Sequence, residues 1–118
     1  MSQSLVLEKA FAFALRIVKL YQYLCDEKRE FILSKQLLTA GTHIGKHIKE
    51  ATAAESKNVF THEMSIALRK ASETEYWLEL LHKSEFLNDK QFESVNSDRL
   101  EILKMLVKIV KTSKLPVE

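Results

Sequence analysis

Apolar residues recur at intervals of three and four along most of the chain, which is the period of an α-helix packed on one side. In the first such segment, 5–25, the recurring apolar positions are Val6, Ala10, Phe13, Ile17, Tyr21 and Leu24. The basic residues Arg16 and Lys19 fall off this stripe, and the charged run 26–29 follows it. The pattern predicts an amphipathic helix over 5–25 that ends in a turn.

Two further stripes follow. One predicts a helix over 30–53 and begins at Phe31 or Ile32. It continues through Leu37, Leu38, Gly41, Ile44, Gly45, Ile48 and Ala51. The other alternates four and three residues apart, the spacing of an a/d seam between packed helices. Its members are Phe60, Met64, Ala67, Ala71, Thr74, Leu78 and Leu81. Ser56 is placed to cap the N-terminus of this helix, which is expected over 56–83.

A last helix is expected over 89–112, after a loop at 84–88 in which Asn88 and Gln91 match a capping box. Its inner positions are Phe92, Val95, Arg99, Ile102, Met105 or Leu106, and Ile109. The polar run 96–99 is a weak point at which this helix is expected to kink or fray. Because short polar connections make consecutive helices antiparallel neighbours, the fold class predicted is an all-α, up-down-up-down four-helix bundle, with 1–118 as one domain.

Composition agrees with this class, because two glycines and one proline are too few for a turn-rich β protein. No apolar run reaches the ~20 residues of a membrane span. The first residues have neither a basic region nor an apolar region of signal-peptide length, so we expect a cytoplasmic protein. The single cysteine, Cys25, fits a reducing compartment and lies in no catalytic motif.

Both glycines, Gly41 and Gly45, lie one turn apart inside a predicted helix, where each costs about 1 kcal/mol relative to alanine. Such a strip allows close approach of a partner, and close helix packing within the chain is the simplest reading. The helix expected over 56–83 supplies small residues at matching intervals: Ala67, Ala71 and Thr74. Tyr76 or Trp77 in the same groove, a subunit contact and a phosphate backbone remain alternatives.

Candidate catalytic and metal sites are weak. His43 and His47 have the spacing of two metal ligands on one helix, but no glutamate lies between them and Lys46 would repel a cation. Surface or interface positions and nucleic-acid contacts are the other readings. The Glu79–His82 pair is a single Glu-x-x-His, whereas di-iron bundles need two. We therefore predict a non-enzymatic protein with no cofactor and no metal.

The distribution of charge is more informative than its sum of +2. Lysines gather on one face of the last helix and on the helix over 30–53. These candidate nucleic-acid contacts are Lys46, Lys49, Lys104, Lys108, Lys111 and Lys114. An ordinary solvated face is the alternative. The helix over 56–83 is net acidic, and opposite faces of this kind suit head-to-tail contacts between subunits. Tyr76 and Trp77 are the candidate interface aromatics.

Two stretches carry a family resemblance: LSKQLLTAGTHIGKHIKEA and ESKNVFTHEMSIALRKASETEYWLELL. They resemble the bacterial 23S rRNA intervening-sequence (S23-like) protein family and, more distantly, the accessory variability determinant protein of diversity-generating retroelements. The resemblance extends from Phe11 to Thr112. Relatives more often have small or uncharged residues at His43, Lys46, His47 and Lys49.

The resemblance implies a four-helix bundle that assembles into a ring-like homo-oligomer, expected to be a pentamer, with genes inside 23S rRNA insertions or alone. It implies an RNA-related role and no known reaction. Two hypotheses follow. The first is a homo-oligomer that binds structured RNA or another nucleic acid through repeated basic stripes. The second is an interaction scaffold whose partner is another protein, such as a neighbouring-gene product.

Overall fold

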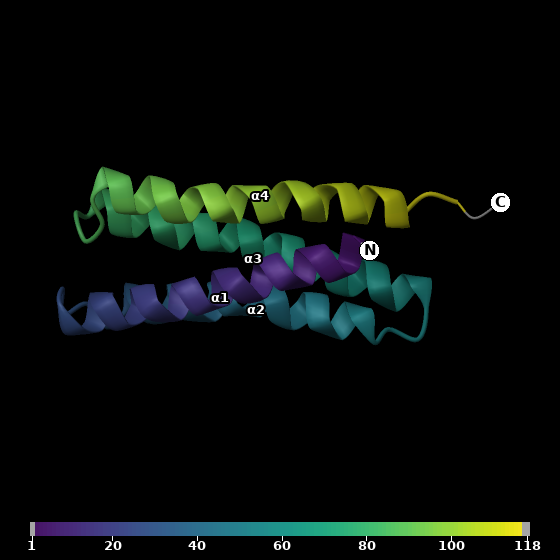
Figure 1. Cartoon of the computed structure of the whole chain (residues 1–118), viewed down its shortest axis with the longest axis horizontal. Coiled ribbons are helices and arrows are strands. Elements are labelled where there is room, and N and C mark those ends of the chain that lie inside the picture. The colour runs from purple at the N-terminus through teal and green to yellow at the C-terminus, as the bar shows by residue number, and fades with distance from the viewer. Residues whose placement is uncertain (1, 117–118) are drawn as a thin grey trace.

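The computed structural model describes residues 2–116, with side chains from residue 5 onward. It contains four helices: α1 (Ser2–Asp26), α2 (Leu33–Thr52), α3 (Lys57–Lys83) and α4 (Asp89–Ser113). They run along the long axis of a rod of 53 × 21 × 20 Å, and each reverses the direction of the one before it (Figure 1). The all-α four-helix bundle is therefore confirmed. None of these helices is long and apolar enough to cross a membrane.

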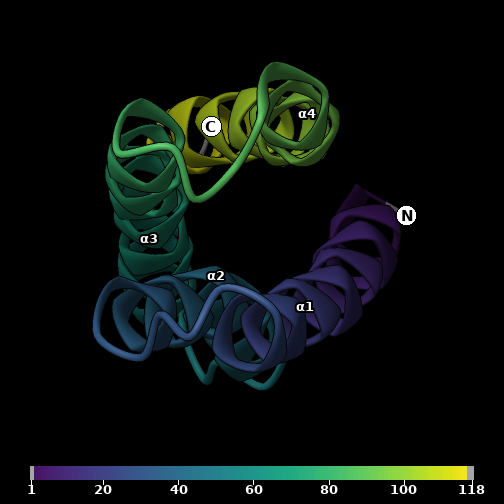
Figure 2. The ribbon, with the colours of Figure 1, turned by 90° about the vertical axis from the view of Figure 1, so that its left-hand side faces the viewer.

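Sequential helices are neighbours, and α2 and α4 lie diagonally across the bundle (Figure 2). The bundle closes least tightly between α1 and α4. Polar contacts cross this seam: Arg16 Nη1 lies 2.7 Å from Asp98 Oδ2, and Lys9 Nζ lies 3.1 Å from Glu101 Oε2. The first and last helices are thus held together partly by exposed ion pairs, which contribute little stability each.

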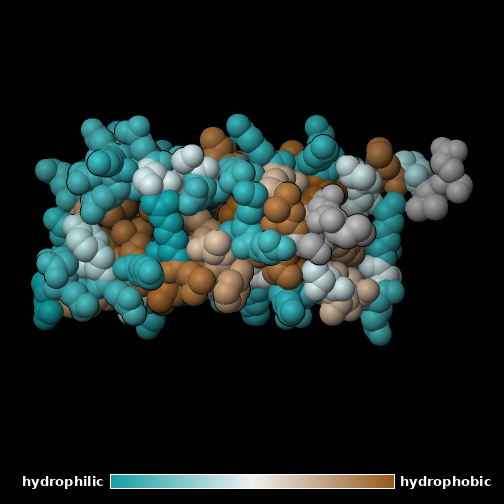
Figure 3. Space-filling model, viewed as in Figure 1, coloured by the Kyte–Doolittle hydropathy of each residue, from teal (hydrophilic) through white to brown (hydrophobic). Residues whose placement is uncertain are grey.

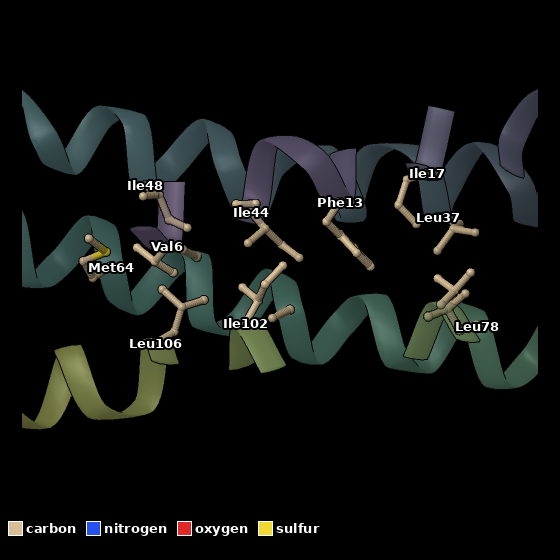
Figure 4. Close-up of a cluster of buried hydrophobic side chains, with 14 of the residues drawn as sticks. Val6, Phe13, Ile17, Leu37, Ile44, Ile48, Met64, Leu78, Ile102 and Leu106 are labelled. Atoms are coloured by element: carbon tan, nitrogen blue, oxygen red, sulfur yellow. The ribbon is translucent and has the colours of Figure 1, made fainter. Parts of the chain in front are cut away.

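Most positions of the predicted stripes form the core (Figure 4), although near the end of α4 the buried residue is Val110 and the predicted Ile109 is only partly buried. The residues buried on all four helices include Val6, Phe13, Ile17, Leu37, Ile44, Ile48, Met64, Leu78, Ile102 and Leu106. Ala67 and Ala71 are buried on α3 with them. Burying this much apolar side chain, at roughly 25 cal/mol per Å² of apolar surface, is the main source of stability for this bundle, whose single cysteine allows no disulfide within the chain.

Both predicted helix starts on the second half of the chain are confirmed. Ser56 Oγ accepts a hydrogen bond from the Val59 backbone N–H, at 3.2 Å. Asn88 and Gln91 form a reciprocal capping box with distances of 2.8 and 2.9 Å. The expected weak point in the last helix is wrong, because α4 continues without a break through 96–99.

The predicted start of the second helix is also wrong, because α2 begins at Leu33 rather than at residue 30. Phe31 and Ile32 are 51% and 76% exposed, so neither begins the buried stripe. The reason is Glu30, whose carboxylate accepts hydrogen bonds from the backbone N–H groups of residues 32, 33 and 34 at 3.1, 2.9 and 2.6 Å. A glutamate side chain thus takes the place of an N-cap residue for α2.

We expect Glu30→Gln to lower the free energy of unfolding by about 1 kcal/mol at neutral pH. Burial raises the pKa of Glu30, but the hydrogen bonds from the N–H groups of Leu33, Ser34 and Ile32 together lower it by more, so the net pKa is below its ordinary value. The carboxylate therefore stabilises the fold above pH about 4.5, and this contribution is lost as the pH falls through the lowered pKa. Urea unfolding of both proteins from pH 7 to pH 3 measures this. A difference that stays constant across that range would contradict the capping role.

The two glycines lie against α1, and not against α3 as the matching small residues suggested. A Cβ built on Gly41 would lie 2.9 Å from Ile17 Cγ1, and one on Gly45 would lie 3.6 Å from Ala10 Cβ. A helix in a bundle has two neighbours, and the spacing of small residues does not say which one faces the glycines. Close packing inside the chain explains Gly41, whereas Gly45 has room for a methyl group.

Candidate nucleic-acid interface

The predicted lysines are all exposed, and they fall into two groups on different sides of the bundle. Lys104, Lys108 and Lys111 lie on α4, and Lys114 is its C-cap residue. Lys46 and Lys49 lie on α2, diagonally opposite. In the part of the chain whose side chains are described, no carboxylate lies within 4.0 Å of any of the six ammonium groups. Their charges are thus free to meet phosphates.

The α4 group extends onto the start of α3, at the right-hand end of the bundle in Figure 1. A hollow of about 720 Å³ lies between these helix ends. Its polar rim contains Lys57, Lys108 and the hydroxyls of Ser56, Thr112 and Ser113. Lys57 Nζ donates to the Leu115 carbonyl oxygen at 2.6 Å, and the positive end of the α3 dipole adds to the basic potential here.

Sequence reasoning missed Lys57, which lies in a different helix from the other basic residues. The signal that would have found it is topological. In an up-down bundle the first turn of the third helix lies beside the last turn of the fourth. His62 lies one turn further along α3 and, with Lys114, lines the adjoining hollow.

The histidine pair has a structural role. His47 Nδ1 lies 2.8 Å from Glu63 Oε1, which links α2 to α3, and the rings of His43 and His47 meet edge to face at 6.2 Å. Burial, followed by the positive charge of Lys46, lowers the pKa of His43 and favours its neutral form. Among the described residues, no group of three histidine, cysteine or acidic side chains is arranged to hold a metal ion.

The histidine of the Glu-x-x-His pair on α3 also makes contacts between helices. His82 Nε2 lies 2.7 Å from Asp89 Oδ1, and its ring stacks on Phe92 with centroids 4.4 Å apart. His82 thus fastens the end of α3 to the start of α4. Its partners explain the position of His82 without a metal.

The two candidate interface aromatics differ in exposure. Tyr76 is 59% exposed on α3, whereas Trp77 is packed partly against the core. Their rings meet edge to face at 5.0 Å, and the Trp77 indole N–H is buried with no hydrogen-bond partner among the described atoms. Tyr76 is therefore the one of the two whose side chain is available to a partner.

Apolar side chains also reach the surface along α1, as the brown patches in the lower half of Figure 3 show. Phe11 and Leu15 are 65% and 54% exposed. With α2 they border a groove of about 690 Å³, and Lys46 and Lys49 lie on its α2 side. The second basic group therefore lies beside an apolar surface. Lys108 of α4 does too, because Leu5, Phe60, Met105 and Ile109 line the hollow next to it.

Comparison with known proteins identifies the fold and the family together. A solved structure described as a protein of unknown function from the S23 ribosomal protein family of Bacteroides thetaiotaomicron VPI-5482 is 48% identical to this chain. It superposes with a TM-score of 0.93 over 94% of this chain and 99% of its own. No curated protein matches the chain. The sequence profile of the 23S rRNA-intervening sequence protein family matches residues 2–108. The chain therefore belongs to the 23S rRNA-intervening sequence protein family.

Proposed function

We propose that this protein is a non-enzymatic homo-oligomer, expected to be a pentamer, that binds structured RNA through basic surfaces repeated by its assembly. The observation that carries the proposal is the end of the bundle where Lys57 and Lys108 border a hollow and Lys104, Lys111 and Lys114 lie exposed on or beside α4. Flexible ammonium groups free of carboxylates suit the phosphates of a backbone better than they suit a small substrate.

Repetition matters because one such surface is weak. Each lysine–phosphate contact releases counterions, and a few contacts in one subunit give modest, strongly salt-dependent affinity. Several copies on one particle raise the effective concentration of the next site once the first is bound. The name of the family, which refers to 23S rRNA, supports RNA as the nucleic acid.

The test reverses the charge of the α4 lysines. We expect the variant with Lys104, Lys108 and Lys111 all changed to glutamate to bind a structured rRNA fragment at least about ten-fold more weakly at 100 mM salt, with a shallower salt slope. Filter binding over a salt series measures both, and circular dichroism verifies that helicity is unchanged. The matched control reverses Lys19, Lys28 and Lys35, which are also exposed but lie toward the other end of the bundle. Equal affinity of the wild type and the α4 variant would show that these lysines are an ordinary solvated face.

A scaffold for a different protein is the second candidate, and the turn between α1 and α2 favours it. Phe31 and Ile32 are exposed there side by side, and the Arg29 guanidinium lies 5.3 Å from the centre of the Phe31 ring. An exposed apolar pair of this kind is suited to contact with the surface of another protein. The ratio of absorbance at 260 and 280 nm of freshly purified protein separates the two candidates. A pure protein spectrum, with no salt-dependent shift on adding RNA, would favour the scaffold.

A further inference from the structure

α1 carries a second apolar stripe besides the one in the core. Leu7, Phe11, Leu15 and Val18 follow each other at spacings of four and three, and Phe11 and Leu15 are mostly exposed. Leu7, Phe11 and Leu15 form the α1 side of the 690 Å³ groove, whose α2 side contains Thr42, Gly45, Lys46 and Lys49. A helix with apolar residues on both faces is expected to be covered on both.

Gly45 supplies a second, independent observation. A Cβ at this position would make an ordinary contact of 3.6 Å with Ala10, so packing inside the subunit leaves room for alanine. Alanine would stabilise the helix by about 1 kcal/mol relative to glycine. Packing within the subunit therefore does not explain why glycine stands here, and Gly45 lines the groove beside Lys46 and Lys49.

Charge indicates what fits this groove. Lys46 and Lys49 line it together with one acidic residue, Glu8, so its charged lining is net positive. Neither lysine has a carboxylate within 4.0 Å among the described side chains. The complementary surface is on α3, where the exposed Tyr76 has Glu73 three residues before it and Glu79 three after it. Glu73 also pairs with Lys70 of the same helix, at 3.4 Å, through an exposed contact that a partner's lysine can replace. Residues at this spacing share one side of a helix. An aromatic ring flanked by carboxylates matches an apolar groove flanked by ammonium groups.

We propose that the Tyr76 face of α3 in one copy docks into the α1/α2 groove of the next copy, which rests on the homo-oligomer proposed above. The Tyr76 ring contacts Phe11 and Leu15, and Glu73 and Glu79 lie near the two lysines. The two surfaces belong to different helices, so the contact is head-to-tail and closes into a ring when the rotation between copies permits. A contact between two grooves would instead bring lysines of both copies together.

Two variants, each defective in one half of the contact, test this by multi-angle light scattering. Phe11→Glu places a charge in the groove, and Tyr76→Ala removes the inserted ring. Both positions are exposed, so circular dichroism should show wild-type helicity. We expect each variant alone to have the mass of one 13.7 kDa subunit. A 1:1 mixture restores a particle of about twice that mass and no larger, because each variant keeps the half that the other lacks. Ile32→Glu, at a more exposed apolar position, is the matched control and keeps the wild-type mass.

The outcomes are separable from those of the proposed function. If the wild type is an oligomer and either variant keeps the full mass, the docking surface is wrong while the homo-oligomer stands. If both variants are monomers but their mixture forms no dimer, the head-to-tail pairing is wrong. If the wild type is itself a monomer, the proposed assembly fails and the docking proposal fails with it.

Discussion

Gly41→Val is expected to lower the free energy of unfolding by more than about 3 kcal/mol, and to leave much of the protein unfolded at 37 °C. The first carbon of the new side chain would lie 2.9 Å from Ile17 Cγ1 and 3.1 Å from Ile17 Cγ2. Ile17 is fully buried, and its branched β-carbon allows few alternative rotamers, so it has no room to move aside. The helices must separate instead, and the surrounding core loses its contacts.

Gly45→Ala is the matched control for Gly41→Val, because it changes a glycine of the same helix one turn away. It should raise the free energy of unfolding by up to about 1 kcal/mol, since the added methyl group meets only ordinary contacts. Urea unfolding at several protein concentrations measures both variants and separates folding from association. If the two substitutions had the same sign, the packing described for α1 and α2 would be incorrect.

Arg99→Ala is expected to lower the free energy of unfolding by about 3 kcal/mol, the second large effect. The Arg99 side chain is buried between α3 and α4, with Nη2 3.1 Å from Glu75 Oε2 and Nε 2.7 Å from Asn96 Oδ1. Nη1 donates to the Ala71 carbonyl oxygen at 3.3 Å. Burial lowers the pKa of Arg99 and the charges of Glu75 and Glu79 oppose this, so the guanidinium depends on its partners. Truncation to alanine removes these bonds and leaves a cavity.

Arg99→Met separates packing from charge, because methionine fills most of the same volume without a charge to satisfy. It should be much milder than alanine, since replacing a buried ionic group by an apolar one of similar size is often neutral. Glu75→Gln should lower the free energy of unfolding by about 1 kcal/mol, an effect between those of methionine and alanine at Arg99. Glu75 is partly exposed to water, and solvent screening weakens its pairing. Thermal and urea unfolding give the order of the three. If methionine were as damaging as alanine, the ionic network rather than the filled volume would stabilise this part of the core.

Most of the fold could be predicted from the sequence because it depends on one-dimensional periodicity. The stripe from Met64 to Leu81 is buried at every position, and the caps at Ser56 and Asn88 are local patterns that need no knowledge of the fold. The errors arose where a contact depends on more than sequence spacing. The start of α2 was misplaced because Glu30 caps it through its carboxylate, which glutamate rarely does at that position.

The candidate site could be predicted only in part, for the same reason. The lysines of α4 lie on one helix and were found together, whereas Lys57 comes beside them only through the antiparallel packing of α3 and α4. The exposed stripe of α1 was overlooked because the core stripe of the same helix already accounted for its periodicity. Which helix faces Gly41 is a three-dimensional fact, which the spacing of small residues in α3 does not determine.

The molar mass of the unmodified protein in solution tests the central claim most directly, because both the RNA binding and the docking contact proposed for this chain depend on copies acting together. Light scattering after gel filtration, from about 1 to 100 μM and at low and high salt, is the measurement. The result predicted is a whole-number multiple of 13.7 kDa, five-fold for the expected ring, that holds across the concentration range. A mass of one subunit under all of these conditions would contradict it.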